Sequence, residues 1–168
     1  MKSKPELQEV DVLTRAKVLW MRDAMGVEPG PQLVQGLLPA GGLILVYGES
    51  GCGKSTLAVD LGLCIASGRA WRGRPVQRGM VLHVAGEGVY GLRLRLSAAV
   101  KTGQVSAGVP YGIVDATLDL AQPGDVSELL ELVASAESEV GDKIAVLIID
   151  TLARCFGIDE NDGSQMRL

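Results

Sequence analysis

The chain has 168 residues, of which 47% are hydrophobic and 21% are charged, and this composition indicates a globular domain rather than a disordered or fibrous chain. The formal net charge of −4, from 16 basic and 20 acidic residues, excludes a global basic field that would hold nucleic acid by charge alone. No apolar run reaches the roughly 18 residues of a membrane span, and the polar start at 1–9 lacks the apolar stretch of a signal peptide. We therefore expect a cytoplasmic protein with no membrane partner.

The first predicted elements are a helix, a linker and a strand. Apolar residues at helical spacing, with charges between them, predict a helix over 7–25. Glycine and proline then mark 26–31 as a linker. Five consecutive apolar residues at 43–47 predict a short strand that is buried on both faces.

After residue 47, helical stretches alternate with short apolar strands, and a basic loop over 68–79 interrupts them. The predicted elements in order are a helix over 55–67, a strand over 80–85, a helix over 90–101, a strand over 111–116, a helix to about 140 and a strand over 144–149. Asp125 and Glu128 fit a capping box that would open the third of these helices. The alternation predicts an α/β fold with a doubly wound, mainly parallel sheet.

A phosphate-binding loop joins the strand at 43–47 to the helix at 55–67. The match to G-x-x-x-x-G-K-[ST] comprises Gly48, Glu49, Ser50, Gly51, Cys52, Gly53, Lys54 and Ser55. Glycines let successive backbone N–H groups turn inward as an anion nest, and the following helix presents its positive end to the phosphates. A chance glycine-rich turn is the alternative, and the strand before and helix after the motif favour the phosphate loop.

Each polar side chain at the end of this loop has a predicted contact. Lys54 can reach the β- and γ-phosphate oxygens, and Ser55 can ligate Mg²⁺ through its hydroxyl. Thr56 can add a hydroxyl contact on the α-phosphate side. The predicted ligands are therefore ATP and Mg²⁺.

Two carboxylates are candidates for the rest of the site. Asp150 ends the apolar strand 144–149, where ligands bind in such sheets, and it would hold Mg²⁺ through water. Glu87 follows the strand 80–85 between two glycines, where it could orient and polarise the attacking water, although a solvated turn residue is the alternative. The residues after Asp150 differ from those of other nucleotide hydrolases. Thr151 stands where many ring ATPases have Glu, and Ala153 stands where signalling GTPases have the glycine of D-x-x-G. No N-K-x-D stretch exists to select guanine.

The segments GESGCGKST, HVAGEGVYGLRLRL and VLIIDTLARCFGIDEN together resemble the RecA-like ATPase core, in particular the AAA-type domain of RepA-like hexameric helicases and primase-associated ATPases of plasmids and phages. The resemblance covers about residues 30–168. It implies nucleotide sites at the subunit interfaces of a homo-hexameric ring that hydrolyses ATP and moves on single-stranded DNA. It also implies that Lys54 and Ser55 bind phosphate and Mg²⁺, that Glu87 is the catalytic base and that Asp150 holds the Mg²⁺ water.

The resemblance sets the expected domain organisation. We expect an N-terminal helix and linker over 1–29 and a partial P-loop ATPase domain over 30–168. The chain ends about 18 residues after Asp150, before the family's polar sensor, DNA-facing loops and arginine finger, and so we also expect an exposed sheet edge. The acidic loop 159–161 matches the family but has no assigned role.

Other functions stay open at this point. One alternative is a nucleotide-dependent kinase or switch, and another is a non-catalytic remnant that binds ATP. Among single residues, His83 is predicted to be a satisfied core histidine rather than a ligand, and Arg93 and Arg95 are predicted to lie on the surface. The arginines of the loop 69–78 with Trp71 favour a solvated loop over a nucleic-acid contact, and the three cysteines are read as free thiols.

Overall fold

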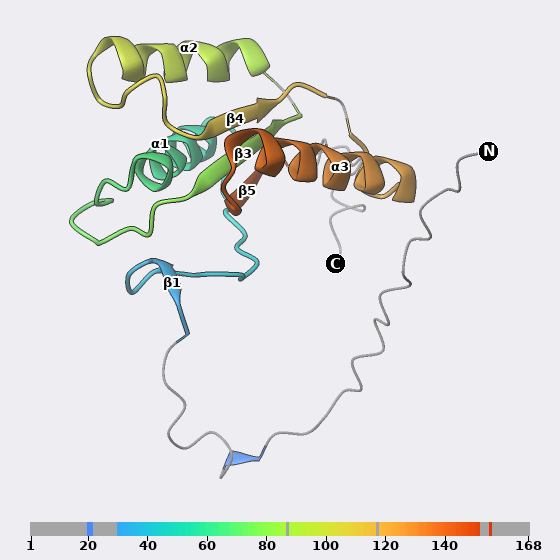
Figure 1. The fold of residues 1–168 in the computed structure, drawn as a ribbon, viewed down its shortest axis with the longest axis horizontal. Coiled ribbons are helices and arrows are strands. Elements are labelled where there is room, and N and C mark those ends of the chain that lie inside the picture. Colours follow the sequence, from blue (N-terminus) through green and yellow to red (C-terminus); the bar gives the residue numbers. More distant parts are fainter. Residues whose placement is uncertain (1–19, 22–29, 87, 117, 152–154, 156–168) are drawn as a thin grey trace.

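The computed structural model of the chain describes residues 20–21, 30–86, 88–116, 118–151 and 155, and these residues form an α/β fold (Figure 1). The predicted helix over 7–25 lies almost entirely outside the described residues. Glu87, Ala153, Arg154 and the acidic loop 159–161 also lie outside them.

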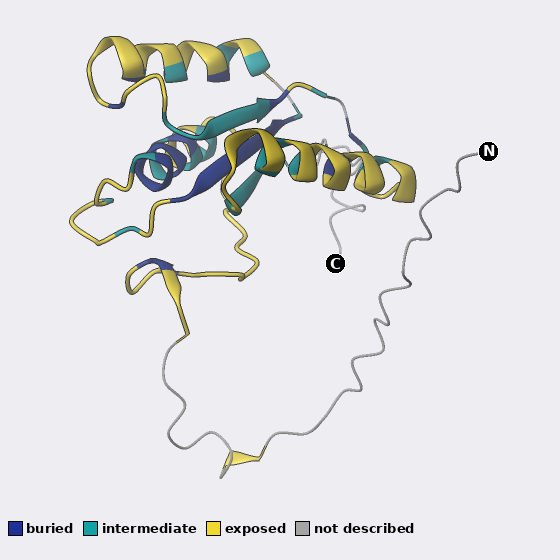
Figure 2. Ribbon diagram, in the orientation of Figure 1, coloured by how far each residue is buried: buried dark blue, intermediate teal, exposed yellow. Residues whose placement is uncertain are grey.

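A parallel sheet of three strands forms the centre of the fold. Its order is β4 (Tyr111–Val114), β3 (Met80–Ala85) and β5 (Ile144–Asp150). Every residue of β3 is buried because this strand has neighbours on both edges, whereas β5 is half-buried along its whole length (Figure 2). The predicted parallel sheet is therefore confirmed for these three strands, and the strand predicted over 111–116 is shorter than expected.

The helices cover both faces of this sheet. The helices α1 (Lys54–Ser67) and α2 (Val89–Lys101) share a core cluster with Ala85 of the central strand, whereas α3 (Pro123–Val140) contributes Leu129 to a cluster with Val84. Since Ala85 and Val84 point to opposite faces of the strand, the helices lie in two layers around it. This arrangement is the doubly wound fold that the sequence predicts.

The capping box predicted for α3 is wrong. The helix begins at Pro123, and its N-cap residue Gln122 makes no side-chain capping bond. Proline fits the first helical position, where its missing N–H would have no partner, so the helix starts two residues before Asp125. The Asp125 carboxylate instead accepts the backbone N–H of Asp119, with Oδ2 2.7 Å from that nitrogen.

The strand predicted at 43–47 is also wrong. No strand forms there, and all five apolar residues are exposed, with Tyr47 86% exposed. The preceding hairpin of β1 (Gln32–Val34) and β2 (Leu38–Pro39) is held by the loop 75–77, and the segment runs from it to the phosphate loop as an open connection (Figure 1). An apolar run is buried as a strand only if a neighbouring strand pairs with it. Within the described residues β5 pairs with β3 alone, so the segment 43–47 has no strand partner in the sheet.

Candidate functional site

The phosphate loop wraps around the side chain of Lys54. The lysine ammonium donates hydrogen bonds to the carbonyl oxygens of Gly48 and Glu49, with nitrogen–oxygen distances of 2.8 and 3.0 Å. An ammonium group has three N–H donors, so one remains for a ligand. The loop residues 48–53 are all exposed, which leaves the concave side of the loop open to solvent.

The start of α1 supplies further donors beside the loop. Gly53 is the N-cap residue with φ 97° and ψ 15°, a left-handed conformation that glycine adopts without steric cost, and no side chain caps the helix. The first intrahelical bond runs from the Leu57 N–H to the Gly53 carbonyl. The N–H groups of Lys54, Ser55 and Thr56 therefore have no intrahelical acceptor, and N–H groups in this position favour an anion together with the helix dipole.

Ser55 and Asp150 come together at one cavity. Its volume is about 290 Å³, and its lining residues are Ser55, Val59, His83, Ala85, Gly88, Leu92, Arg95, Asp150 and Thr151. Asp150 stands at the carboxyl end of β5 and Ser55 at the start of α1, so the strand end and helix start meet there as predicted. The hydroxyl and carboxylate oxygens are the hard ligands that Mg²⁺ prefers.

The surroundings of Asp150 keep its carboxylate ionised. The imidazole of His83, whose Nε2 lies 3.7 Å from Oδ2, lowers the pKa of Asp150 below its ordinary value, and Ser55 and the charge of Arg95 act in the same direction. Partial burial opposes this shift but is the weaker effect. An ionised carboxylate at this place can accept hydrogen bonds from a hydrated cation.

Glu87 itself lies outside the described residues, but the residues on either side of it lie near Asp150 and the cavity. The N–H of Gly86 donates to the backbone carbonyl of Asp150 at 2.8 Å, and Gly88 lines the cavity. The strand β3 neighbours β5, as the interpretation of Glu87 requires, with Ala85 opposite Asp150 in the register.

Arg95 is exposed, as the sequence predicts, and it also lines the cavity, which the sequence did not predict. Its guanidinium belongs to the charges that act on Asp150. The signal that could have found it is the spacing of Gly88, Leu92 and Arg95, which are four and three residues apart and so share one side of α2.

Three side chains of the basic loop over 68–79 form hydrogen bonds to other parts of the protein. Arg69 donates to the Gln104 carbonyl and Arg74 to the Gln35 carbonyl. The Trp71 indole N–H donates to the Asp60 carboxylate at 2.9 Å. These bonds agree with the interpretation of the loop as anchored by its aromatic residue.

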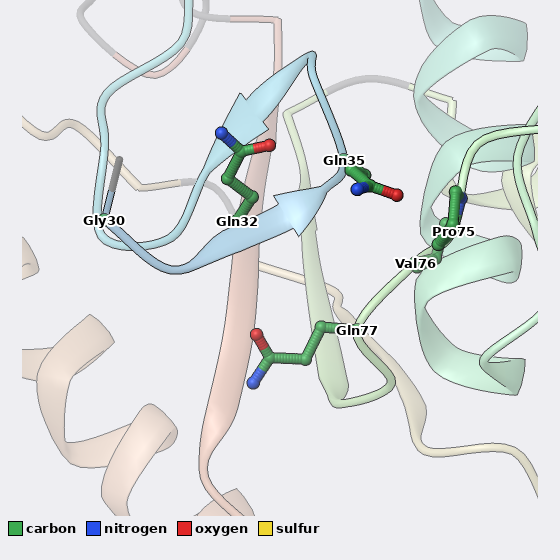
Figure 3. Close-up of a pocket in the computed structure, with 6 residues that line it drawn as sticks. All are labelled: Gly30, Gln32, Gln35, Pro75, Val76 and Gln77. Atoms are coloured by element: carbon green, nitrogen blue, oxygen red, sulfur yellow. The ribbon is translucent and has the colours of Figure 1, made fainter. Parts of the chain in front are cut away.

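A second, larger cavity of about 560 Å³ lies between the hairpin and the loop 75–77, away from the phosphate loop (Figure 3). Its lining residues are Gly30, Gln32, Gln35, Pro75, Val76 and Gln77. Because none of these side chains carries a charge, this cavity lacks the cations that a polyphosphate needs. The smaller cavity at Asp150 is therefore the candidate site.

A comparison with protein families agrees with this geometry. A family model described as AAA domain matches residues 9–168. The chain belongs to the AAA domain family. This AAA domain is accordingly a P-loop-type ATPase domain that binds nucleotide. Neither the curated proteins nor the solved structures contain a match to the chain. Among the described residues, no helix is both long and apolar enough to cross a lipid bilayer.

Proposed function

We propose that this AAA domain binds ATP together with Mg²⁺ and is the nucleotide-binding core of a RecA- or RepA-like ATPase. The observation that carries the proposal is the meeting of Ser55 and Asp150 at one cavity beside the phosphate loop that encloses Lys54. The donors of the loop and helix start suit the phosphates, and the two oxygen side chains suit a divalent cation.

Each residue has one task in this proposal. The free N–H of Lys54 and the backbone N–H groups of 48–56 hold the β- and γ-phosphates, with the Thr56 hydroxyl on the α-phosphate side. Ser55 ligates Mg²⁺ directly and Asp150 does so through water. Held by these two residues, Mg²⁺ would neutralise charge on the phosphates. Glu87, whose neighbours flank the cavity, is the proposed base that orients the attacking water.

We further propose that the complete ATPase works as a homo-hexameric ring of a DNA-helicase-type replication protein in the cytoplasm, acting on single-stranded DNA. The support is the resemblance of the three motif segments and their order along the chain. A kinase or switch and a non-catalytic ATP-binding protein remain the outcomes against which this proposal is tested.

The deciding experiment is a titration of the purified chain with ATP and Mg²⁺ by calorimetry, comparing Lys54→Ala with wild type. Loss of a charge-assisted hydrogen bond costs about 1.5–3 kcal/mol, so we expect ATP affinity to fall by roughly 10- to 100-fold. The matched control is Lys101→Ala, an exposed lysine at the end of α2, which should bind ATP as wild type does.

Equal ATP affinity in wild type and Lys54→Ala would overturn the proposed function. ATP hydrolysis that rises with added single-stranded DNA supports the helicase-type ATPase. Phosphate transfer to a small acceptor would instead identify a kinase, and binding without turnover would identify a non-catalytic ATP-binding protein.

A further inference from the structure

A line of polar side chains crosses the otherwise apolar sheet beneath α1. His83 in the central strand lies opposite Ile113 of β4 and Ile148 of β5. Tyr111 comes two residues before Ile113, and Asp150 comes two residues after Ile148. Because side chains alternate along a strand, Tyr111, His83 and Asp150 all point to the same face of the sheet.

These three side chains are in contact. The Tyr111 hydroxyl lies 2.8 Å from Nδ1 of His83, and Nε2 of His83 lies 3.7 Å from Oδ2 of Asp150. His83 is 1% exposed and is the buried polar residue of the core, yet it also lines the cavity at the candidate site. The line thus begins in the core and ends at the carboxylate that faces Ser55.

The chemistry of the neighbours selects one tautomer of His83. The ionised Asp150 carboxylate has no hydrogen to donate, which favours a hydrogen on the Nε2 that faces it, and the Tyr111 hydroxyl then donates to Nδ1. A neutral imidazole whose Nδ1 accepts carries its hydrogen on Nε2, the nitrogen that faces the Asp150 carboxylate. At 3.7 Å this contact is longer than a hydrogen bond, and the attraction between the Nε2–H and the carboxylate favours one orientation of the carboxylate.

We propose that His83, held in the Nε2–H tautomer by Tyr111, is a positioning residue that orients the Asp150 carboxylate toward the cation side of the cavity. The inference rests on the proposed function and extends it to residues that contact the cation ligand Asp150 directly or through His83. Oδ2 lies toward the imidazole Nε2–H, which leaves Oδ1 to accept from a water on the cation. The Tyr111 phenol acts only through His83.

The test compares His83→Leu and Tyr111→Phe with wild type by calorimetric titration of Mg²⁺ in the presence of ATP. Loss of such a supporting partner typically weakens metal binding by 10- to 100-fold, so we expect the half-saturating Mg²⁺ concentration to rise by about that factor in His83→Leu. We expect a smaller rise in Tyr111→Phe, partial recovery in His83→Gln, whose amide can donate to Asp150, and unchanged ATP binding without Mg²⁺.

The matched control is Val84→Ala, at the next residue of the same strand, fully buried but facing the opposite layer. It loses core packing without touching Asp150, so its Mg²⁺ dependence should equal that of wild type. If His83→Leu does not fold, Tyr111→Phe still tests the inference, because it removes only a single hydroxyl and keeps the packing of the ring.

A second measurement needs neither nucleotide nor cation. The chain has one histidine, so the nitrogen-15 NMR signals of a histidine-labelled sample report His83 alone. We expect the Nε2–H tautomer in wild type and a mixture of tautomers in Tyr111→Phe.

The outcomes separate the two proposals. An Nδ1–H tautomer in wild type, or a Mg²⁺ dependence that is the same in the variants and in Val84→Ala, overturns the inference alone. A wild-type chain that binds no ATP overturns the proposed function and the inference together.

Discussion

At the scale of single residues, Tyr111 and Asp150 respond to pH in opposite directions. Asp150 has a lowered pKa in the folded chain, so its contribution to stability is present above its unfolded pKa of about 3.9 and is lost as pH falls through the lower folded value. Tyr111 has a raised pKa, so its contribution is present below its unfolded pKa of about 10 and is lost as pH rises above it.

The alkaline limb gives a direct prediction for Tyr111→Phe. Above pH 10 the unfolded wild type releases the phenol proton that the folded chain keeps, which costs up to about 1.4 kcal/mol of stability for each pH unit. The variant lacks this phenol, so its free energy of unfolding should fall less steeply with pH. The measurement is urea denaturation at several pH values between 8 and 11.

Tyr90→Phe is the control for this comparison because Tyr90 is 76% exposed and belongs to α2. Its free energy of unfolding should fall with rising pH as steeply as that of wild type. The explanation is contradicted if Tyr111→Phe and Tyr90→Phe lose stability with equal slopes.

At the scale of elements, the position of α1 depends on one glycine. A Cβ added at Gly62 would lie 2.8 Å from Cε2 of Tyr111, closer than Cβ atoms approach other atoms, and 3.2 Å from Cδ1 of Ile148, which is tighter than most such contacts. The helix therefore lies directly against β4 and β5, and this contact sets Ser55, at its first turn, beside Asp150.

We predict that Gly62→Ala destabilises the fold. Overpacking costs about 1–3 kcal/mol, and the better helix propensity of alanine returns up to about 1 kcal/mol, so a net loss of roughly 1–2 kcal/mol is expected. Chemical denaturation of the purified variant measures it.

Gly91 in α2 provides the matched helical glycine. The nearest atom to an added Cβ there is Nη1 of Arg95 at 3.6 Å, an ordinary contact. Gly91→Ala should be neutral or should stabilise the fold by up to about 1 kcal/mol. Equal losses in Gly62→Ala and Gly91→Ala would show that close packing is not what requires glycine at position 62.

At the scale of the whole molecule, the apolar segment 43–47 stays exposed to solvent within the described fold. Leu43 is fully exposed, and Leu45, Val46 and Tyr47 are each more than half exposed. Contiguous exposed apolar side chains promote association between molecules, because burying them removes apolar surface from water.

We predict that Leu43→Lys combined with Leu45→Lys reduces self-association and leaves the free energy of unfolding within about 0.5 kcal/mol of wild type. Sedimentation velocity and chemical denaturation test the two parts. The control is Leu82→Lys in the buried central strand, which should prevent folding. A loss of several kcal/mol in the double variant would contradict the exposed position of the segment.

Features set by near neighbours in the chain could be predicted from the sequence. The glycine–lysine–serine run followed by helical periodicity predicted α1 from 55 to 67, one residue from its observed start at Lys54. The apolar runs predicted β3 and β5 with Asp150 at the end of the latter. These features depend on interactions within a few residues, which a sequence displays directly.

Only the tertiary structure decided which surfaces the elements share. It left the apolar run 43–47 exposed, it brought Arg95 to the cavity and it joined Tyr111 to His83 across 28 residues of chain. Each of these outcomes depends on pairing between distant segments, which local pattern does not encode. The sequence by itself thus determined a phosphate loop, the helix α1 that follows it and the strands β3 and β5, whereas the packing of α1 against the sheet determined which side chains surround the cation side of the site.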